Sequence, residues 1–269
     1  MSDSSDHATF WDHLDELRSR LMRMLLVFVA MTVIAFLMKE HLFDAILAPR
    51  NSSFVSYRLL GIHAFSVQLI NTGLTEQFMV HMRTSMYVGL LAASPYILYE
   101  LFRFISPGLY EYERRPVLAL VTAAYVMFFL GMLLNYFLIF PMTVQFLGTY
   151  QVSADVTNML TLQSYIDTLI VMSLFMGVLF ELPVVCWLMG QMGIIDGTIM
   201  RHYRRHAIVA IFVLSAIVTP TTDVFTLFIV SLPIWMLYEF SILIVNTPKC
   251  KQSRKTSWFS ENISENIWS

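Results

Sequence analysis

The sequence predicts an all-α, polytopic membrane protein with six transmembrane helices, the last two of them short, and with both termini in the cytoplasm. Three observations lead to this class. Only 13% of the 269 residues are charged, against about a quarter in ordinary soluble domains. The mean hydropathy is +0.64. Apolar runs of roughly 20 residues, the length that crosses a bilayer as a helix, recur along the chain.

Six apolar segments follow one another along the chain. Each is expected to be helical, because a segment inside lipid must satisfy its own backbone hydrogen bonds. The segments are Leu21–Met38, Met79–Phe102, Val117–Phe140, Leu169–Ile194, Ala207–Val218 and Val224–Val245.

The first segment is expected to remain in the mature protein. The residues before it are acidic, whereas a cleaved signal peptide begins with a basic region, and no small-residue cleavage site follows. Ahead of it, Phe10, Leu14 and Leu17 stand at helical spacing and predict an amphipathic helix on the cytoplasmic surface. The predicted domains are therefore an amphipathic N-terminal segment (1–20), a transmembrane domain (21–246) and a polar cytoplasmic tail (247–269).

The orientation follows from the Lys and Arg residues near the segment ends, which favour the cytoplasmic side. Arg18 precedes the first segment, and Arg114 and Arg115 lie between the second and third. Further basic residues lie between the fourth and fifth segments and after the sixth. On the opposite side, the predicted loop Pro141–Ser164 has no Lys or Arg. Both termini are therefore placed in the cytoplasm.

The fifth segment is unusually short. Its 12 or so residues span roughly 18 Å as a helix, against a hydrocarbon core of about 30 Å. The sixth contains Pro233 and Glu239, so its continuous apolar part is expected to be short too. Such a pair either thins the bilayer, which would help a polar cargo to cross, or packs as a hairpin inside a helical bundle. Both alternatives stay open.

Glu181 lies near the middle of the fourth segment. A carboxyl group there is costly and normally faces a cavity or a polar partner. We expect either a hydrogen bond to another helix or a contact with a substrate or a partner helix. Pro183, two residues on, permits a kink.

Acidic residues stand among the arginines before the third segment. Glu111 and Glu113 precede Arg114 and Arg115, and Glu16 lies on the same predicted membrane face. The glutamates either pair with their own neighbours or converge from two elements on a cationic ligand. Guanidinium is the cation that suits them best, because its planar fork binds a carboxylate through two hydrogen bonds.

Sequence motifs of enzymes are missing. The chain has no HExxH, no GxSxG, no phosphate-binding GK[ST] loop and no Cys/His cluster with metal-ligand spacing. Its histidines lie in termini, loops or segment ends, where solvated side chains are expected. We therefore predict no catalytic residue, no metal and no cofactor. An interaction protein and a proton-coupled secondary transporter of a small solute, with Glu181 as coupling carboxylate, are the two classes that remain.

Five stretches of the chain resemble the TatC family of the twin-arginine protein translocase. They are HLDELRSRL (His13–Leu21), ASPYILYELFRFISPGLYEYERR (Ala93–Arg115), YFLIFP (Tyr136–Pro141), GVLFELPV (Gly177–Val184) and VTPTTDVF (Val218–Phe225). The resemblance covers nearly all of positions 10–246. It implies a receptor for twin-arginine signal peptides of folded proteins in the bacterial cytoplasmic (inner) membrane. It also implies TatA- and TatB-like single-span partners, self-association and transport driven by the protonmotive force. It does not imply a nucleic-acid partner.

The same resemblance implies which residues matter. The signal-peptide site would consist of Glu16 and Glu113, with Phe104, Leu109 and Tyr110 shaping the loop. Glu181 matches the acid on the family's concave membrane face, and segments five and six match the short helices where a partner helix docks. The remaining structural or transport-related positions are Pro49, Arg18, Arg114, Arg115, Pro220 and Asp223. In the turn TPTTD, Thr221 stands where the family commonly has a second proline.

Overall fold

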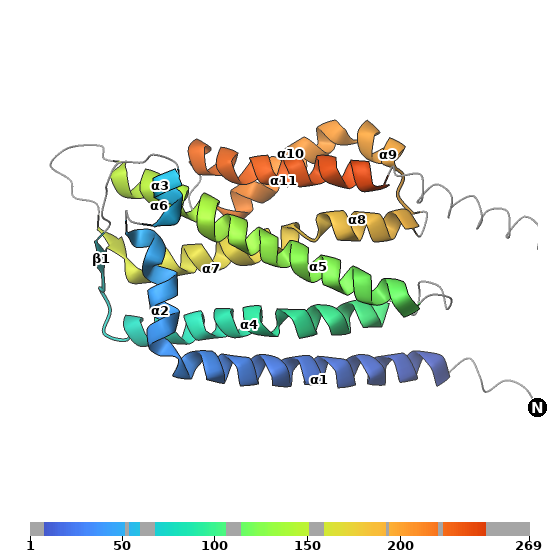
Figure 1. Ribbon diagram of the computed structural model, residues 1–269, viewed down its shortest axis with the longest axis horizontal. Helices are drawn as coiled ribbons and strands as arrows, with labels where there is room; N and C mark the ends of the chain where they lie inside the picture. Colours follow the sequence, from blue (N-terminus) through green and yellow to red (C-terminus); the bar gives the residue numbers. More distant parts are fainter. Residues whose placement is uncertain are drawn as a thin grey trace, which may run out of the picture. The chain divides into compact units, whose positions relative to one another are not determined.

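The computed structural model describes residues 8–51, 54–59, 68–105, 114–150, 159–191, 194–219 and 223–245, without the side chains of 8–14, 59, 104–105 and 114–119. Nearly all of this chain is helical (Figure 1). The helices are α1 (Ala8–Leu37), α2 (Lys39–Leu47), α3 (Val55–Leu59), α4 (Glu76–Ile105), α5 (Arg114–Leu134), α6 (Phe140–Thr149), α7 (Leu162–Leu179), α8 (Leu182–Gln191), α9 (Gly197–His202), α10 (Arg204–Val218) and α11 (Val224–Val245). A 3-10 turn, η1 (Ala48–Arg50), follows α2, and a π-helical turn, η3 (Asn135–Ile139), joins α5 to α6.

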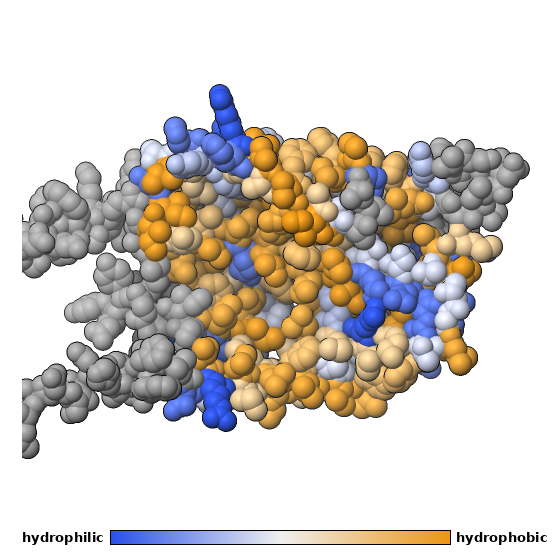
Figure 2. All heavy atoms as spheres, turned by 180° about the vertical axis from the view of Figure 1, so that it is seen from behind, coloured by the Kyte–Doolittle hydropathy of each residue, from blue (hydrophilic) through white to orange (hydrophobic). Residues whose placement is uncertain are grey.

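Four helical segments of the described chain are long and apolar enough to cross a membrane. They are Asp15–Leu37, Leu120–Thr149, Leu162–Gln191 and Val224–Val245. Large apolar side chains are exposed along them, among them Leu26 and Leu37 of α1. Figure 2 shows most of the described surface on its visible face as hydrophobic. The chain is thus a mostly helical, multi-pass membrane protein. Helices α4 and α10 are not among the four, so six spanning helices stay a prediction.

The predicted amphipathic segment and the first apolar segment lie on one helix. Helix α1 runs without a break through position 20, the predicted boundary between these two segments. The reason is local, because no Pro or Gly occurs within α1 and Glu16 and Arg20 form an ion pair one turn apart. The amphipathic stretch is therefore the first part of a 30-residue helix.

Prolines explain two further differences and one agreement. The predicted start of a loop at Pro141 is wrong, since the helix continues through this proline to Thr149. The π-helical turn η3, directly before it, accommodates the missing N–H. The predicted kink at Pro183 is confirmed: α7 ends at Leu179 and α8 begins at Leu182. The prediction that segment six is short is wrong, because Pro233 lies within a continuous helix of 22 residues, or roughly 33 Å. Helix α10, with 15 residues, spans only about 22 Å.

The chain forms two compact units. The first comprises Met1–Tyr125 and Gly148–Ile170, and the second comprises Val126–Leu147 and Val171–Ser269. In the first unit, α4 lies antiparallel beside α1 (Figure 1). Gly89 permits this approach, since a Cβ there would lie 2.6 Å from the Cα of Thr32. Small residues allow such close contacts between helices in membranes.

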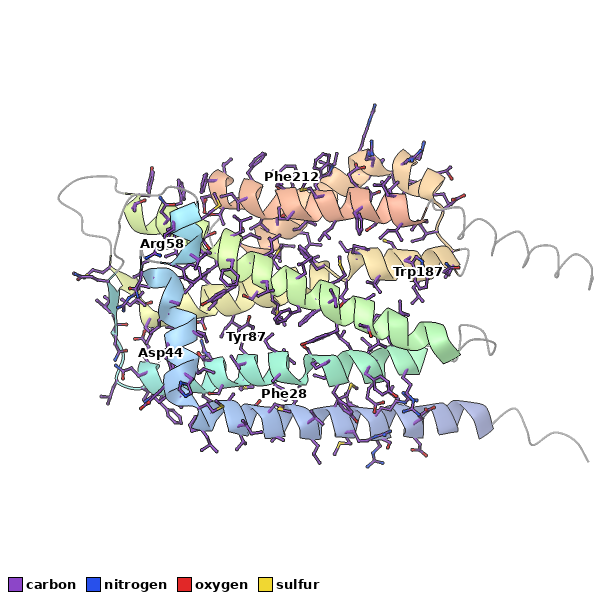
Figure 3. The ribbon with its side chains drawn as sticks, viewed as in Figure 1. Phe28, Asp44, Arg58, Tyr87, Trp187 and Phe212 are labelled. Atoms are coloured by element: carbon purple, nitrogen blue, oxygen red, sulfur yellow. The ribbon has the colours of Figure 1, made fainter. Side chains whose placement is uncertain are left out.

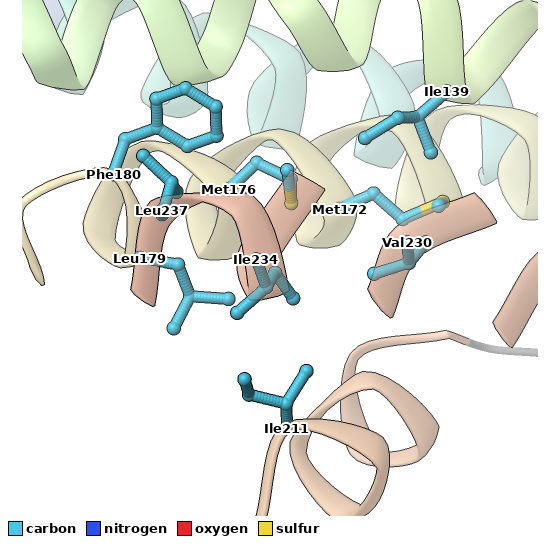
Figure 4. Close-up of a cluster of buried hydrophobic side chains, with 9 residues drawn as sticks. All are labelled: Ile139, Met172, Met176, Leu179, Phe180, Ile211, Val230, Ile234 and Leu237. Atoms are coloured by element: carbon cyan, nitrogen blue, oxygen red, sulfur yellow. The ribbon is translucent and has the colours of Figure 1, made fainter. Parts of the chain in front are cut away.

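The second unit has the main apolar core. Helices α8 and α10 pack against α11, and Figure 4 shows the buried side chains that α7, α10 and α11 contribute around Met176 and Ile234. Gly131 of α5 lies against α7, since its Cβ would stand 2.6 Å from the backbone oxygen of Met176. The core residues are Ile139, Met172, Met176, Leu179, Phe180, Ile211, Val230, Ile234 and Leu237.

A two-stranded sheet, absent from the all-α prediction, lies in the first unit. Strand β1 (Leu69–Ile70) pairs in parallel with β2 (Leu160–Thr161). Beside it, the buried carboxylate of Glu76 accepts hydrogen bonds from the backbone N–H groups of Thr72 (2.8 Å), Gly73 (2.9 Å) and Gln163 (3.2 Å). One side chain thus connects the start of α4 with the start of α7.

The Glu76 contacts predict a pH dependence of stability. Hydrogen bonds from Gly73 and then Thr72 lower the pKa of Glu76 below its ordinary value of 4.5. Because the folded-state pKa is the lower one, the contribution is complete above pH 4.5 and is lost as the pH falls through the folded-state pKa. We expect the Tm of the wild type to fall more steeply below pH 4.5 than that of Glu76→Gln. Parallel Tm curves for the two proteins would contradict this.

Candidate functional site

A network of charged side chains, with Arg20 and Glu100 buried at its centre, joins α1 to α4. Arg20 is buried and donates from Nη1 to Glu100 Oε2 at 3.3 Å. Its Nε donates to Glu16 Oε1 at 3.1 Å, and its Nη2 donates to the same oxygen. Glu100, only 2% exposed, also accepts from the Tyr96 hydroxyl at 3.0 Å and lies 3.7 Å from Arg23 Nη1. A buried carboxylate needs such partners.

Helical spacing positions this network. Glu16 and Arg20 lie one turn apart on α1, and Tyr96 and Glu100 lie one turn apart on α4. The antiparallel packing of the two helices brings Arg20 against Glu100, which is 80 residues away in sequence. Glu100 is not among the site residues predicted from the sequence. The available signal was a carboxyl group one turn after Tyr96, near the end of a predicted spanning segment, with arginines at the corresponding end of the first segment.

Glu16 is the predicted signal-site residue whose side chain is described. It is 45% exposed and binds the Arg20 guanidinium. Arg18, on the same helix, is exposed. Glu113, Leu109 and Tyr110 lie outside the described residues. The backbone places Phe104 in the last turn of α4 and Arg114 and Arg115 in the first turn of α5, and the side chains of these three residues are not described. Convergence of Glu16 and Glu113 therefore stays a prediction.

Glu181 lies at the break between α7 and α8. Its backbone N–H donates to Val178 at 3.1 Å, and its carbonyl accepts from Val185 at 2.9 Å. Both carboxyl oxygens are buried, and neither has a hydrogen-bond partner among the described residues. The described part of the chain thus does not provide the hydrogen bond to another helix that was one alternative. A second polar group in this unit is satisfied in part, since Asn135 donates to Ser173 at 2.7 Å.

Two other predicted positions have local structural contacts. Pro49 is buried in η1, and its carbonyl accepts from the Tyr57 hydroxyl at 2.8 Å. Burial raises the pKa of Tyr57, so this hydroxyl stays a donor at neutral pH. Asp223 caps α11, because its Oδ2 accepts from the N–H of Thr226 at 2.7 Å. Pro220 lies outside the described residues.

The prediction of solvated histidines is wrong for His81. Its side chain is buried in the first unit and stacks on Phe36, with ring centroids 4.1 Å apart. Within the described ranges, no group of three or more His, Cys, Asp or Glu residues is placed to hold a metal ion.

Comparison with known proteins places these features in one family. Residues 12–233 match the family described as Sec-independent protein translocase protein (TatC). Proteins of that name are similar to this chain in Desulforapulum autotrophicum (34% identity, over 90% of this chain and 86% of the relative), in Deinococcus radiodurans (33%, 88% and 85%) and in Aquifex aeolicus (32%, 91% and 98%).

Solved structures agree with this comparison. A crystal structure of the twin arginine translocase receptor TatC matches with a TM-score of 0.73 and 32% identity, over 87% of this chain and 97% of that one. A second structure of the receptor, in DDM, matches with a TM-score of 0.74 and 31% identity, over 87% of this chain and all of that one. The chain therefore belongs to the TatC family of Sec-independent protein translocase proteins.

Proposed function

We propose that this chain is the receptor subunit of a twin-arginine translocase and binds the arginine pair of signal peptides at the cytoplasmic face of the membrane. Its family makes it a component of a protein translocase, not an enzyme. The observation that carries the proposal is the contact of Glu16 with Arg20. Glu16 already accepts two hydrogen bonds from a guanidinium, the group that a twin-arginine peptide presents.

The proposed site combines Glu16 with Glu113, and Phe104, Leu109 and Tyr110 form its loop. A signal arginine would replace Arg20 at Glu16. Arg20 would keep its hydrogen bond to Glu100, so the exchange leaves no buried charge without a partner. A charge-assisted hydrogen bond contributes roughly 1.5–3 kcal/mol. The net gain in binding free energy is smaller, because Glu16 gives up its contact with Arg20 when it binds the signal arginine.

We further propose the topology that this site requires. Helices α4 and α10 complete six spans within the domain 21–246, and the segments 1–20 and 247–269 are cytoplasmic. Arg18, Arg114 and Arg115 support this orientation, because basic residues favour the cytoplasmic side. The membrane would be the bacterial inner membrane, whose protonmotive force would drive transport.

Single-span TatA- and TatB-like proteins are the proposed partners, along with further copies of this chain. In the second unit, α10 and α11 line an open apolar pocket of about 270 Å³. Phe212, labelled in Figure 3, lines it together with Phe228 and Trp235. An apolar side chain of a partner helix would fit there, and Glu181 would contact a polar group of a partner or of the cargo.

A peptide titration tests the receptor function. The purified chain should bind a labelled Arg-Arg signal peptide, and Glu16→Ala or Glu113→Ala should each weaken binding by roughly tenfold, the lower range for a lost charge-assisted hydrogen bond. A Lys-Lys peptide keeps the positive charges but lacks the planar guanidinium that binds a carboxylate through two hydrogen bonds. It should therefore bind the wild type more weakly. Glu40→Ala, an exposed acid of α2, is the matched control. Equal affinity for both peptides, unchanged by Glu113→Ala, would contradict the proposal.

A further inference from the structure

A polar cavity lies in the first unit, apart from the network around Glu16. It has a volume of about 460 Å³ and is formed by α2, η1 and the residues that lead into α3. Its wall is mixed in character. Phe43, Leu47 and Phe54 give it an apolar part, and Asp44, Arg50 and Asn51 give it a polar part. Figure 3 labels Asp44 on α2.

The two charged side chains of this cavity are not neutralised within the described chain. Asp44 is exposed and Arg50 is half-buried. Neither forms an ion pair or a side-chain hydrogen bond, with each other or with any other described residue. By contrast, Arg83 and Asp167 in the same unit pair at 2.9 Å. A cavity with one carboxylate and one guanidinium, each available, suits a ligand with one positive and one negative group.

The position of the cavity indicates where that ligand comes from. The first candidate span ends at Leu37, and α2 begins at Lys39 and turns away from the axis of α1 (Figure 1). The first residues of α2, Lys39 to His41, are exposed and polar. The cavity therefore lies a few residues beyond the end of a candidate membrane-spanning helix, which would put it at the depth of the lipid headgroups.

We propose that this cavity binds the headgroup of a zwitterionic phospholipid with a primary ammonium group, a phosphatidylethanolamine. The Arg50 guanidinium would bind the phosphate, and the Asp44 carboxylate would accept hydrogen bonds from the ammonium group. Asn51 adds a further donor at the polar wall. The apolar side chains, Phe43, Leu47 and Phe54, would cover the glycerol and the first acyl carbons.

The same chemistry sets a preference among lipids. Phosphatidylcholine has a quaternary ammonium without an N–H, so it cannot donate a hydrogen bond to Asp44. Phosphatidylglycerol has no cation and would leave Asp44 without a counter-charge beside an anionic ligand. We therefore expect phosphatidylethanolamine to bind more tightly than either of the other two.

Native mass spectrometry tests this preference. The whole chain is placed in micelles that contain equal amounts of the three lipids and is then released from the detergent. The wild type should retain one molecule of phosphatidylethanolamine in preference to the other two lipids. Asp44→Asn should remove the preference over phosphatidylcholine, and Arg50→Gln should lower retention of all three lipids, each by roughly tenfold for a lost charge-assisted contact. Glu40→Gln and Arg58→Gln, which change exposed charges outside the cavity wall, should match the wild type.

Three results would overturn the inference. The first is equal retention of the three lipids by the wild type, and the second is a preference for phosphatidylethanolamine that survives Asp44→Asn. The third is competition by soluble glycerophosphoethanolamine as strong as that of the lipid, which would indicate a water-soluble zwitterion as ligand. Tm measurements identify variants with altered folding. If Arg50→Gln is one of them, Arg50→Met, which removes the charge and keeps an apolar stem of similar shape, takes its place. Unchanged retention of all three lipids by that variant would also overturn the proposal.

Discussion

Arg20→Leu is expected to destabilise the first unit by about 3 kcal/mol, the lower range for breaking a buried ion pair. The side chains of Arg20 and Glu100 are only 7% and 3% exposed. Without Arg20, the buried carboxylate of Glu100 keeps the Tyr96 hydroxyl and a longer contact with Arg23 at 3.7 Å. These two partners place the loss at the lower end of the range. The Tm of the purified chain in detergent measures it.

Two comparisons separate this effect from a general loss of charge. Arg83→Leu breaks the ion pair with Asp167, whose side chains are 49% and 38% exposed, and should cost at most about 1 kcal/mol. Arg20→Leu combined with Glu100→Leu should recover most of the lost stability, because an apolar pair replaces a buried charge without a partner. If the double variant were as unstable as Arg20→Leu alone, the unpaired carboxylate would not be the cause.

The sequence predicted helices well where hydrophobicity alone determines them. Segment six was predicted at Val224–Val245, the bounds of α11, because a long apolar run has few alternatives in a membrane. The breaks were less predictable. Pro183 does interrupt a helix, whereas Pro141 and Pro233 do not. Whether a proline interrupts a helix depends on whether a π-helical turn or packing against neighbouring helices accommodates the missing N–H. Neither feature can be recognised from the residues around the proline.

Contacts distant in sequence explain what was missed in the candidate site. Glu16 was identified, but its partner Arg20 also binds Glu100, and that pair forms only because α1 and α4 pack side by side. His81 looked like a solvated residue at a segment end, and the aromatic side chain that covers it belongs to another helix. Strands of two residues, like β1 and β2, are too short to show any periodicity.

Glu181→Ala is expected to separate transport from signal binding. Export of twin-arginine cargo into inverted membrane vesicles should fall by roughly tenfold or more, which corresponds to about 1.4 kcal/mol of lost interaction with a partner or cargo. Binding of the Arg-Arg peptide should stay as in the wild type, because Glu181 belongs to the second unit and the proposed signal site to the first. A solute transporter would behave differently, since the chain alone would take up a small solute into liposomes.

Stability gives this prediction a further readout. Both carboxyl oxygens of Glu181 are buried without a partner in the described chain, so their removal relieves a desolvation cost and should leave the Tm unchanged or raise it. The matched control is Asn135→Ala, which breaks the buried hydrogen bond to Ser173 and should lower the Tm. A transport defect in a variant of undiminished stability would mean that Glu181 serves an interaction beyond the folded chain. A lowered Tm together with lost peptide binding would instead make it a structural residue and refute the separation of roles.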